Sequence, residues 1–516
     1  MVTSTAGAQG VAPSVDVLIR GGTLVDGTGA AGRKADVGVR GDRIVFIGDA
    51  TRGGVKAART IDATNLVVAP GFIDPHSHTQ GDLSSPNEER RVNAAYLMQG
   101  VTTVVTNNDG GGPTGIGKTL DAWAKNGIGT NALLFVPQGS VRGAVMGMSD
   151  AKPTATQLDA MRAIVARGMH DGAFGLSTGL YYAPGSYSST EEVIELAKVA
   201  AASGGIYDSH MRDESSYTIG LVGAVNEVLR IAREANIPVH ISHIKALGAD
   251  VWGQSDTIIK LVRHAQAQGL RVTADQYPYT ASGTSVGASL LPRWAEVGGR
   301  DSLRARTADS ATRARLVGEM KENMRRRGGA SMLLITGGRD PSIRGKTLEQ
   351  VAQSRGKSPI DAAIDIILAG DASVASFNMR DDDIERFMKE PWVATGSDGS
   401  DGHPRKYGTF PRIFAVYVRE KHVLSLEEAV QRSSARTAQT LGLRDRGTIM
   451  EGLAADIAVF DPATIVDRST YEQPTRLAEG VKYVLVNGVL AVDSGRATGK
   501  LAGHALRKNG KPDATP

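Results

Sequence analysis

The sequence predicts an α/β protein in which a (β/α)8 barrel of the TIM type carries a small β-sandwich domain built from both termini. Two observations support this prediction. Residues 15–70 and 446–495 consist of short alternating strands joined by glycine turns, a pattern typical of antiparallel sheets. Residues 71–440 instead alternate continuous apolar runs with helical patterns, which indicates parallel strands that are buried on both faces.

The central region holds eight strand candidates, the number that closes a (β/α)8 barrel. The first candidate ends at Phe72-Ile73-Asp74. Helices are expected between the strands, because Ser189-Thr190-Glu191-Glu192 and Ser425-Leu426-Glu427-Glu428 have the spacing of capping boxes. The other seven candidates are residues 101–106, 131–137, 173–177, 205–210, 237–243, 271–275 and 392–396.

The region between residues 280 and 391 is too long for one crossover, so we expect an inserted subdomain at about 283–345. Its stretch Ser310–Arg327 places Leu316, Met320 and Met324 on one helical face, and we interpret the arginines there as the solvated side. The predicted division is a flexible N-terminus (1–14), a composite β-sandwich domain (15–70 plus 444–500), a barrel (71–443) and a tail (501–516).

Composition excludes several classes of function. The 516 residues include 59 Lys+Arg and 55 Asp+Glu, and the only basic run is Arg325-Arg326-Arg327, so nucleic-acid binding is not indicated. Without cysteine there can be no disulfide, thiol nucleophile or Cys-ligated zinc, so any metal must be held by His and carboxylates. No apolar run is long enough to cross a bilayer, which predicts a soluble protein. Residues 6–9, Ala-Gly-Ala-Gln, resemble the end of a cleaved signal peptide, so cytoplasmic and periplasmic locations both stay open.

Side chains that can bind a metal follow five of the predicted strands. Two histidines at i and i+2 on a strand point to the same side, so His76 and His78 can reach one ion. Each histidine alone has an ordinary structural explanation, but the carboxyl ends of barrel strands meet at one face. We therefore expect a His/carboxylate site for Zn²⁺ or a similar divalent ion. The six expected ligands are His76, His78, Asp109, His210, His243 and Asp398.

Motifs spread from about residue 15 to 495 resemble those of a known family. Residues 67–78 look like the opening signature of the amidohydrolase superfamily, and residues 447–461 resemble its return strand. Further motifs narrow the resemblance to the N-acyl-D-amino-acid deacylases, also called D-aminoacylases. These motifs are Ser-His-Met-Arg at 209–212, Ile-Ser-His-Ile-Lys at 241–245, Asp-Gln-Tyr-Pro-Tyr at 275–279, Gly-Ser-Asp-Gly at 396–399, and residues 403–412.

The resemblance implies a distorted barrel, a composite β-sandwich and an insertion between the seventh and eighth strands. It also implies that His76 and His78 line one metal position, whereas His210 and His243 hold another. Asp398 would be the catalytic acid/base.

The resemblance also implies residues that contact the substrate. Tyr279 and Arg405 match positions that the family uses on the side of the substrate's carboxylate. Lys245, in the motif that contains His243, is a further expected substrate contact.

The chain departs from the family at one ligand position. The family usually ends its second strand with Gly-Asn-Cys-Gly and uses that cysteine as a metal ligand, whereas this chain has Asn107-Asn108-Asp109-Gly110. A carboxylate also binds Zn²⁺, at ~2.0–2.2 Å, so metal binding is expected to survive. Whether the site holds one ion or two, and whether it prefers zinc or another divalent metal, stays open.

The expected function is metal-dependent removal of the acyl group from N-acyl amino acids, preferentially of the D series. A metal-bound hydroxide would attack the amide carbonyl while Asp398 transfers the protons. The expected partner is a small-molecule amide, with neither nucleic acid nor membrane. The acyl group, the side-chain preference and the oligomeric state are not predicted.

Three other interpretations of these residues stay open. The site could hydrolyse a cyclic amide or a bulky aryl-amide or peptide-like substrate, or the barrel could be a non-catalytic scaffold. Residues 112–119 also fit the P-loop pattern G-x-x-x-x-G-K-T, which would indicate nucleotide binding. Six residues, 106–111, separate this loop from the preceding apolar strand, and that gap argues against a P-loop.

Overall fold

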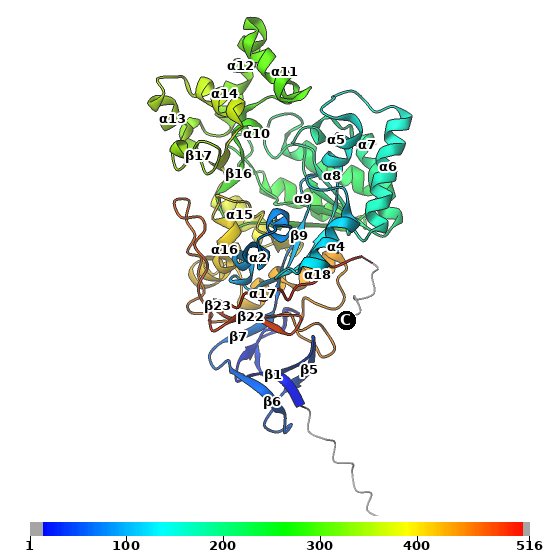
Figure 1. The fold of residues 1–516 in the computed structure, drawn as a ribbon, viewed down its shortest axis with the longest axis vertical. Helices are drawn as coiled ribbons and strands as arrows, with labels where there is room; N and C mark the ends of the chain where they lie inside the picture. The colour runs from blue at the N-terminus through cyan, green and yellow to red at the C-terminus, as the bar shows by residue number, and fades with distance from the viewer. Residues whose placement is uncertain (1–13, 509–516) are drawn as a thin grey trace, which may run out of the picture.

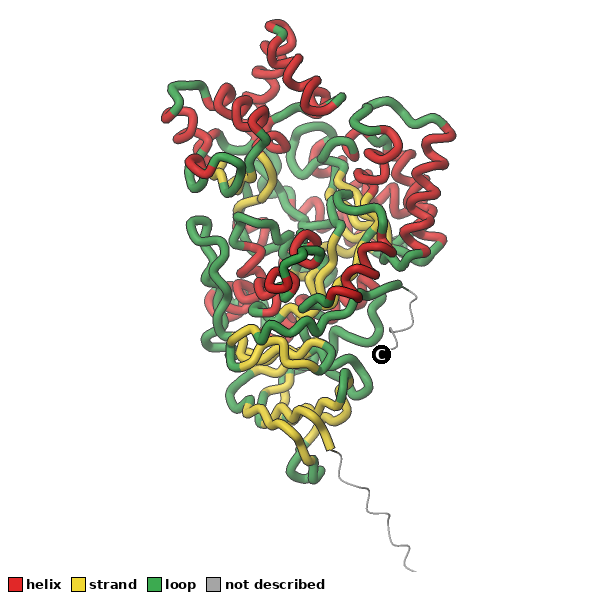
Figure 2. Tube along the Cα trace, in the orientation of Figure 1, coloured by secondary structure: helices red, strands yellow, loops and turns green. Residues whose placement is uncertain are grey.

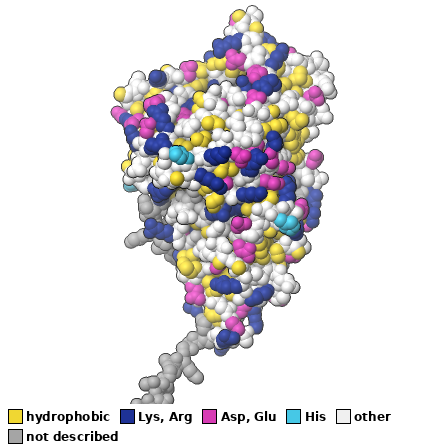
Figure 3. All heavy atoms as spheres, turned by 180° about the vertical axis from the view of Figure 1, so that it is seen from behind, with side chains coloured by type: hydrophobic (Ala, Val, Ile, Leu, Met, Phe, Trp, Pro, Cys, Tyr) yellow, Lys and Arg dark blue, Asp and Glu magenta, His cyan; other side chains and the backbone are white. Residues whose placement is uncertain are grey.

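The computed structural model describes residues 14–508, with a β-sandwich at one end, a barrel in the middle and a mainly helical subdomain at the other end (Figures 1 and 2). The signal-peptide-like residues 6–9 and nearly all of the predicted N-terminal segment lie outside the described residues. No helix within residues 14–508 is both long and apolar enough to cross a membrane. On the face shown in Figure 3, basic and acidic side chains are interspersed rather than separated by sign.

The β-sandwich joins the two ends of the chain in one sheet. Strand β7 (Val67–Pro70) pairs antiparallel with β20 (Ile457–Phe460), and buried side chains such as Ile19, Val37 and Leu485 fill the space between the two sheets. The first sheet, β5-β4-β1-β6, consists of β1 (Ser14–Arg20), β4 (Asp36–Arg40), β5 (Arg43–Gly48) and β6 (Lys56–Asp62). The second, β23-β22-β21-β20-β7-β2-β3, adds β2 (Thr23–Leu24), β3 (Arg33–Lys34), β21 (Val481–Val486), β22 (Val489–Asp493) and β23 (Arg496–Ala497).

Eight parallel strand positions form the barrel, which confirms the predicted fold class. The third position is divided into β10 (Asn131–Leu134), which pairs with the second strand, and β11 (Val136–Pro137), which pairs with the fourth. A parallel bridge between Ser77 and Gly399 connects the ends of the first and last strands. The other strands are β8 (Phe72–Asp74), β9 (Val101–Thr106), β12 (Gly175–Gly179), β13 (Ile206–His210), β14 (Val239–Ile241), β15 (Val272–Gln276) and β19 (Val393–Thr395).

Helices cover the outside of the barrel. The predicted capping residues open two of them: the side chains of Ser189 and Ser425 accept hydrogen bonds from the backbone N–H groups of Glu192 and Glu428. The larger helices are α4 (Ile116–Asn126), α5 (Gln138–Met146), α6 (Ala155–His170), α7 (Thr190–Ala202), α8 (Gly220–Ala235), α9 (Ser255–Ala267), α15 (Asp381–Met388), α16 (Arg405–Arg412), α17 (Leu426–Ser433) and α18 (Ala435–Leu441). Short helices α1 (Gln80–Leu83), α2 (Glu88–Arg91) and α3 (Ala94–Leu97) follow the first strand, and a π-helical segment, Ile413–Glu420, follows α16.

The inserted subdomain extends well beyond the predicted end at about residue 345. Its exit strand β18 (Ser373–Phe377) pairs antiparallel with its entry strand β16 (Ala281–Ser285), so the insertion closes only at residue 377. Its own apolar core runs from Val286 to Val374. The other elements are β17 (Leu333–Ile335), α10 (Val286–Leu290), α11 (Gly299–Ala308), α12 (Ser310–Arg326), α13 (Leu348–Ser354) and α14 (Pro359–Ala369).

The interpretation of the arginines of Ser310–Arg327 as a solvated face was wrong for Arg327, which is only 3% exposed. The described part of the predicted tail lies against the barrel, because Ala505 bridges to Ala132 and the Leu506 N–H donates to the Ala132 carbonyl.

We predict that Leu316→Ala lowers the free energy of unfolding of the inserted subdomain by about 2–5 kcal/mol, because Leu316 is fully buried in its core. Hydrogen exchange of residues 286–374 measures this change. The partly buried neighbour Val317→Ala is the matched control and should cost clearly less. A loss below about 1 kcal/mol at Leu316 would show that this core does not stabilise the insertion.

Candidate metal centre

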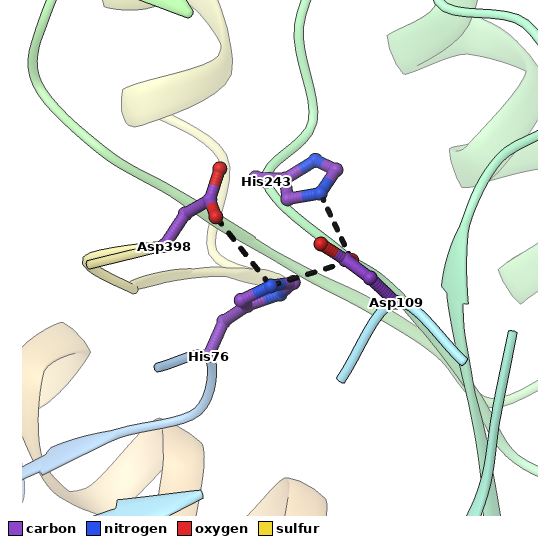
Figure 4. A group of neighbouring side chains, drawn as sticks. All are labelled: His76, Asp109, His243 and Asp398. Carbon is purple, nitrogen blue, oxygen red and sulfur yellow. Dashed lines mark hydrogen bonds and ion pairs between the residues drawn. The ribbon is translucent and has the colours of Figure 1, made fainter. Parts of the chain in front are cut away.

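The six predicted ligands converge at the carboxyl ends of the barrel strands. His76 and His78 lie just beyond β8, Asp109 follows β9, and His210 is the last residue of β13. His243 and Asp398 follow β14 and β19 in the same way. Figure 4 shows four of the side chains, His76, Asp109, His243 and Asp398, pointing toward one another.

The Asp109 carboxylate lies at the centre of this group. Its Oδ1 is 3.4 Å from His76 Nε2 and 3.3 Å from His243 Nε2. The same oxygen is 3.5 Å from His210 Nδ1, while Oδ2 is 3.4 Å from His78 Nε2. A single carboxylate therefore contacts all four imidazoles.

Asp398 closes the other side of the group. Its Oδ1 is 3.0 Å from His78 Nε2 and 3.7 Å from His76 Nε2, and its Oδ2 is 2.6 Å from Arg405 Nη1. Burial by itself would raise the pKa of Asp398, but Arg405 and then His243 hold that pKa far below its usual range. Burial also raises the pKa of Asp109, and His76 and His210 lower it well below the ordinary value. Both carboxyl groups are therefore ionised.

Three of these residues have left-handed backbone conformations, with φ of 57° at Asp109, 36° at His243 and 47° at Asp398. Such conformations cost a non-glycine residue about 1–3 kcal/mol, and they persist only where surrounding contacts enforce them. The chain turns sharply at these positions, directly after each strand.

Buried carboxylates fix these turns. Asp74 Oδ1 accepts hydrogen bonds from the backbone N–H groups of His76, at 3.1 Å, and Ser397, at 2.9 Å. The Asp398 N–H in turn donates to the His76 carbonyl at 2.8 Å. Asp74 therefore ties the first and last strands of the barrel together at the site.

Asp275, on β15, fixes the turn that follows the neighbouring strand β14. Its Oδ1 accepts from the backbone N–H of His243 at 3.1 Å, and its Oδ2 lies 2.9 Å from His240 Nε2. Asp208 accepts from Ser242 Oγ at 2.8 Å and from Asn108 Nδ2 at 3.1 Å, which links the residues that precede His243 and Asp109. The loop conformations are thus set from beneath the site.

The donor set fits a divalent metal ion. His76 is fully buried, and neither of its ring nitrogens makes a hydrogen bond with a described residue. Buried polar atoms normally have partners, so such an imidazole points to an absent ligand. Imidazole nitrogens and carboxylate oxygens are the ligands that zinc takes when no thiolate is available.

Glu214, which the sequence analysis missed, belongs to a second ligand-like group with His210 and His243. Glu214 lies four residues after His210, the last residue of β13. A carboxylate so close to a histidine at a strand end is the sequence signal that could have identified Glu214 as a further ligand. Its Oε1 is 3.0 Å from His243 Nδ1 and 2.6 Å from Lys245 Nζ. The predicted substrate contact Lys245 therefore forms an ion pair with Glu214 in the cavity wall.

The ligand group opens into a cavity of about 660 Å³. Arg405, at the start of α16, lines this cavity, and its guanidinium lies 4.7 Å from the Tyr277 ring centroid. Tyr279, the other expected contact of the substrate's carboxylate, is not among the residues that line the cavity, and its hydroxyl lies 3.4 Å from Asp467 Oδ2, so its role stays a prediction. Tyr277 lines the cavity instead.

The sequence profile of the amidohydrolase family matches residues 59–492. The chain belongs to the amidohydrolase family. This amidohydrolase hydrolyses C–N bonds, as D-aminoacylases do.

Two relatives are named D-aminoacylases. The D-aminoacylase of Alcaligenes xylosoxydans xylosoxydans is 36% identical over 96% of this chain and 98% of that protein. The fold is also similar to that of a D-aminoacylase with a binuclear metal centre. The TM-score is 0.82 and the identity 34%, over 96% of this chain and 100% of that one.

A third relative was solved with a metal. The N-acyl-D-glutamate deacylase of Bordetella bronchiseptica, solved with zinc and a phosphonate inhibitor, has a TM-score of 0.81 and 32% identity, over 96% of this chain and 100% of that one. The family membership removes the support for a P-loop at residues 112–119, where Lys118 is exposed and α4 already begins at Ile116.

We predict that Asp109→Asn weakens zinc binding at least about 10–100-fold, the loss typical even for groups that only support a ligand. Asparagine keeps the shape but removes the charge that contacts the four imidazoles. Zinc content after dialysis against a weak chelator measures the change. Asp401→Asn, in the same cavity but outside the ligand group, is the control. Equal zinc retention in the Asp109 and Asp401 variants would exclude Asp109 as a ligand.

Proposed function

We propose that this amidohydrolase is a metal-dependent deacylase of N-acyl-D-amino acids. One observation carries the proposal: Asp109 contacts four histidines and Asp398 contacts two of them, in the wall of a cavity that Arg405 also lines. The similarity to D-aminoacylase over 96% of the chain supports the choice of an N-acyl-D-amino acid as substrate.

The four histidines form two pairs, and the Asp109 carboxylate contacts both pairs. His76 and His78 would hold a metal on one side of its carboxylate, and His210 and His243 would hold one on the other. Zn²⁺ fits both pairs, and an ion bound there supplies Lewis acidity that activates water and polarises the amide carbonyl. Because Asp109 contacts both histidine pairs, its carboxylate could be a ligand of a single ion or of two ions.

Asp398 is the proposed acid/base. Its carboxylate is ionised and reaches into the cavity beside His78, so it can accept a proton from the attacking water. The same carboxyl group then returns this proton to the departing amine nitrogen, which leaves as a neutral amine. Arg405 pairs with the Asp398 carboxylate before the first transfer and again after the second.

Arg405 is also the proposed partner of the substrate's α-carboxylate. Its Nε is buried and makes no hydrogen bond with a described residue, so the guanidinium retains donors for a ligand. A guanidinium can hold a carboxylate through two parallel hydrogen bonds. Because Arg405 contacts Asp398 as well, a carboxylate held there would place the neighbouring amide next to the acid/base.

We predict that Asp398→Asn retains zinc but lowers kcat about 10²–10⁴-fold, the usual contribution of a general acid/base. The measurement is deacylation of N-acetyl-D-methionine by zinc-loaded protein, with metal content read in parallel. Asp382→Asn, an exposed carboxylate of α15, is the control. Near-normal turnover by the Asp398 variant would remove this residue from the mechanism.

The substrate class is tested with a panel of zinc-loaded reactions. N-acyl-D-amino acids should be hydrolysed faster than their L enantiomers, hydantoins and aryl amides. Preference for hydantoins or aryl amides would favour the alternative amidohydrolase activities. No hydrolysis of any amide by fully metal-loaded protein would favour a non-catalytic scaffold.

A further inference from the structure

Arg325 and Arg326 end helix α12 of the inserted subdomain, and Arg327 follows directly, where the chain meets the barrel. Arg325 forms a bidentate ion pair with Asp250, with Nη1–Oδ1 and Nη2–Oδ2 distances of 3.0 and 2.8 Å. Arg326 Nε donates to Ser216 Oγ at 3.2 Å. These two contacts hold the end of α12 against loops that follow β13 and β14.

This attachment places Arg327 in the wall of the catalytic cavity, where its side chain is almost completely buried. Its Nε donates to the Tyr217 hydroxyl at 2.6 Å, its Nη2 to the Tyr181 hydroxyl at 3.1 Å, and its Nη1 to Ser282 Oγ at 3.4 Å. All three acceptors are neutral. Within residues 14–508, no carboxylate lies within ion-pair distance of Arg327.

The other lysine and arginine of this cavity have counter-charges. Lys245 pairs with Glu214 at 2.6 Å, and Arg405 pairs with Asp398 at 2.6 Å. Arg327 is therefore the buried cation of the cavity wall whose charge the described residues leave uncompensated. A buried charge without a partner is costly, so its retention at this place indicates that an anion from outside supplies the partner.

The hydroxyl groups around Arg327 leave one further donor. Tyr181 uses its proton on the Ala288 carbonyl, at 2.7 Å, and Ser282 uses its proton on Asn378 Oδ1, at 3.2 Å. The Tyr217 hydroxyl accepts from Arg327 and keeps its own proton available. Arg327 and Tyr217 together can thus donate to one anionic group.

Arg327 and Arg405 both line the cavity and lie on either side of the entry strand of the insertion. Ser282 of β16 contacts Arg327, whereas a Cβ on the adjacent Gly283 would lie 2.8 Å from Arg405 Nη2. Tyr181, which accepts from Arg327, lies with its ring centroid 5.8 Å from that of His210. Two guanidinium groups therefore flank one stretch of the wall, next to the metal ligands.

We propose that Arg327 binds a second anionic group of the substrate, so that the preferred substrates are N-acyl amino acids with two negative charges. The α-carboxylate would contact Arg405, and a carboxylate on either the side chain or the acyl group would contact Arg327 and Tyr217. This inference rests on the proposed function and narrows its substrate class.

The test compares substrates that differ by one charge at nearly constant shape. N-acetyl-D-glutamate and N-acetyl-D-glutamine probe the side-chain position, and N-succinyl-D-alanine and its succinamide analogue probe the acyl position. We expect zinc-loaded wild type to favour the charged member of one pair by at least about tenfold in kcat/KM. The pair that shows this preference identifies where the second carboxylate lies.

Arg327→Met should lower kcat/KM for the charged member about 30-fold or more, the loss expected when one partner of a buried charge pair is removed. Its effect on the neutral member should be small, so the preference disappears. Arg327→Lys keeps the charge and should retain part of the preference, including in the event that the methionine variant folds poorly. Arg304→Met removes the same charge from the exposed surface of α11, outside the cavity and away from the contacts that hold α12, and should leave the ratio unchanged.

A purely structural role of Arg327 gives a different result. It would lower the thermal midpoint and the activity on both members of a pair equally, and this outcome overturns the inference. Equal use of charged and neutral substrates by wild type overturns it as well.

Binding separates this inference from the proposed function. Calorimetry with zinc-loaded Asp398→Asn should show tighter binding of the charged member than of its neutral analogue. Such binding without turnover by wild type would mean that the proposed function fails while the anion site stands. Turnover without any preference for the charged member, in binding or in kcat/KM, would mean that the proposed function stands while the second anion site fails.

Discussion

The contacts of the Asp109 carboxylate with four imidazoles are the interaction on which the site depends. His76 and His78 come from one strand end and His210 and His243 from two others, and Asp109 lies between the two pairs. A cysteine thiolate, which the family usually has here, offers one soft sulfur atom. A carboxylate offers two hard oxygens that can face different partners, which keeps an all-His/carboxylate metal site feasible in a chain without cysteine.

The ligand positions require strained backbone conformations, and hydrogen bonds to buried carboxylates stabilise them. Asp109, His243 and Asp398 have left-handed conformations that a side chain rarely adopts. Asp74 and Asp275 accept hydrogen bonds from the backbone beside the ligands, and they reach these positions because they lie at the buried ends of β8 and β15. The barrel thus supplies both the ligands and the contacts that hold them in register.

The sequence was sufficient to predict the parts of the site that depend on strand ends. His76, His210 and Asp398 follow apolar runs, and the carboxyl ends of such strands must meet in a barrel. Residues on loops and on the insertion were less accessible, because their positions depend on tertiary contacts. Arg327 was assigned to a solvated face since its helix has the expected apolar stripe, and only the docking of α12 on the barrel buries it. Glu214 was not predicted because it lies in the loop after β13, whose conformation depends on tertiary contacts.

Diffraction at the zinc absorption edge from crystals of the metal-loaded enzyme would show whether Asp109 binds the metal. We expect anomalous peaks beside the Asp109 carboxylate, with at least one oxygen of Asp109 and the imidazoles of one or both histidine pairs at ~2.0–2.2 Å from the ion. Zinc bound elsewhere, or bound by the histidines with Asp109 turned away, would contradict this expectation.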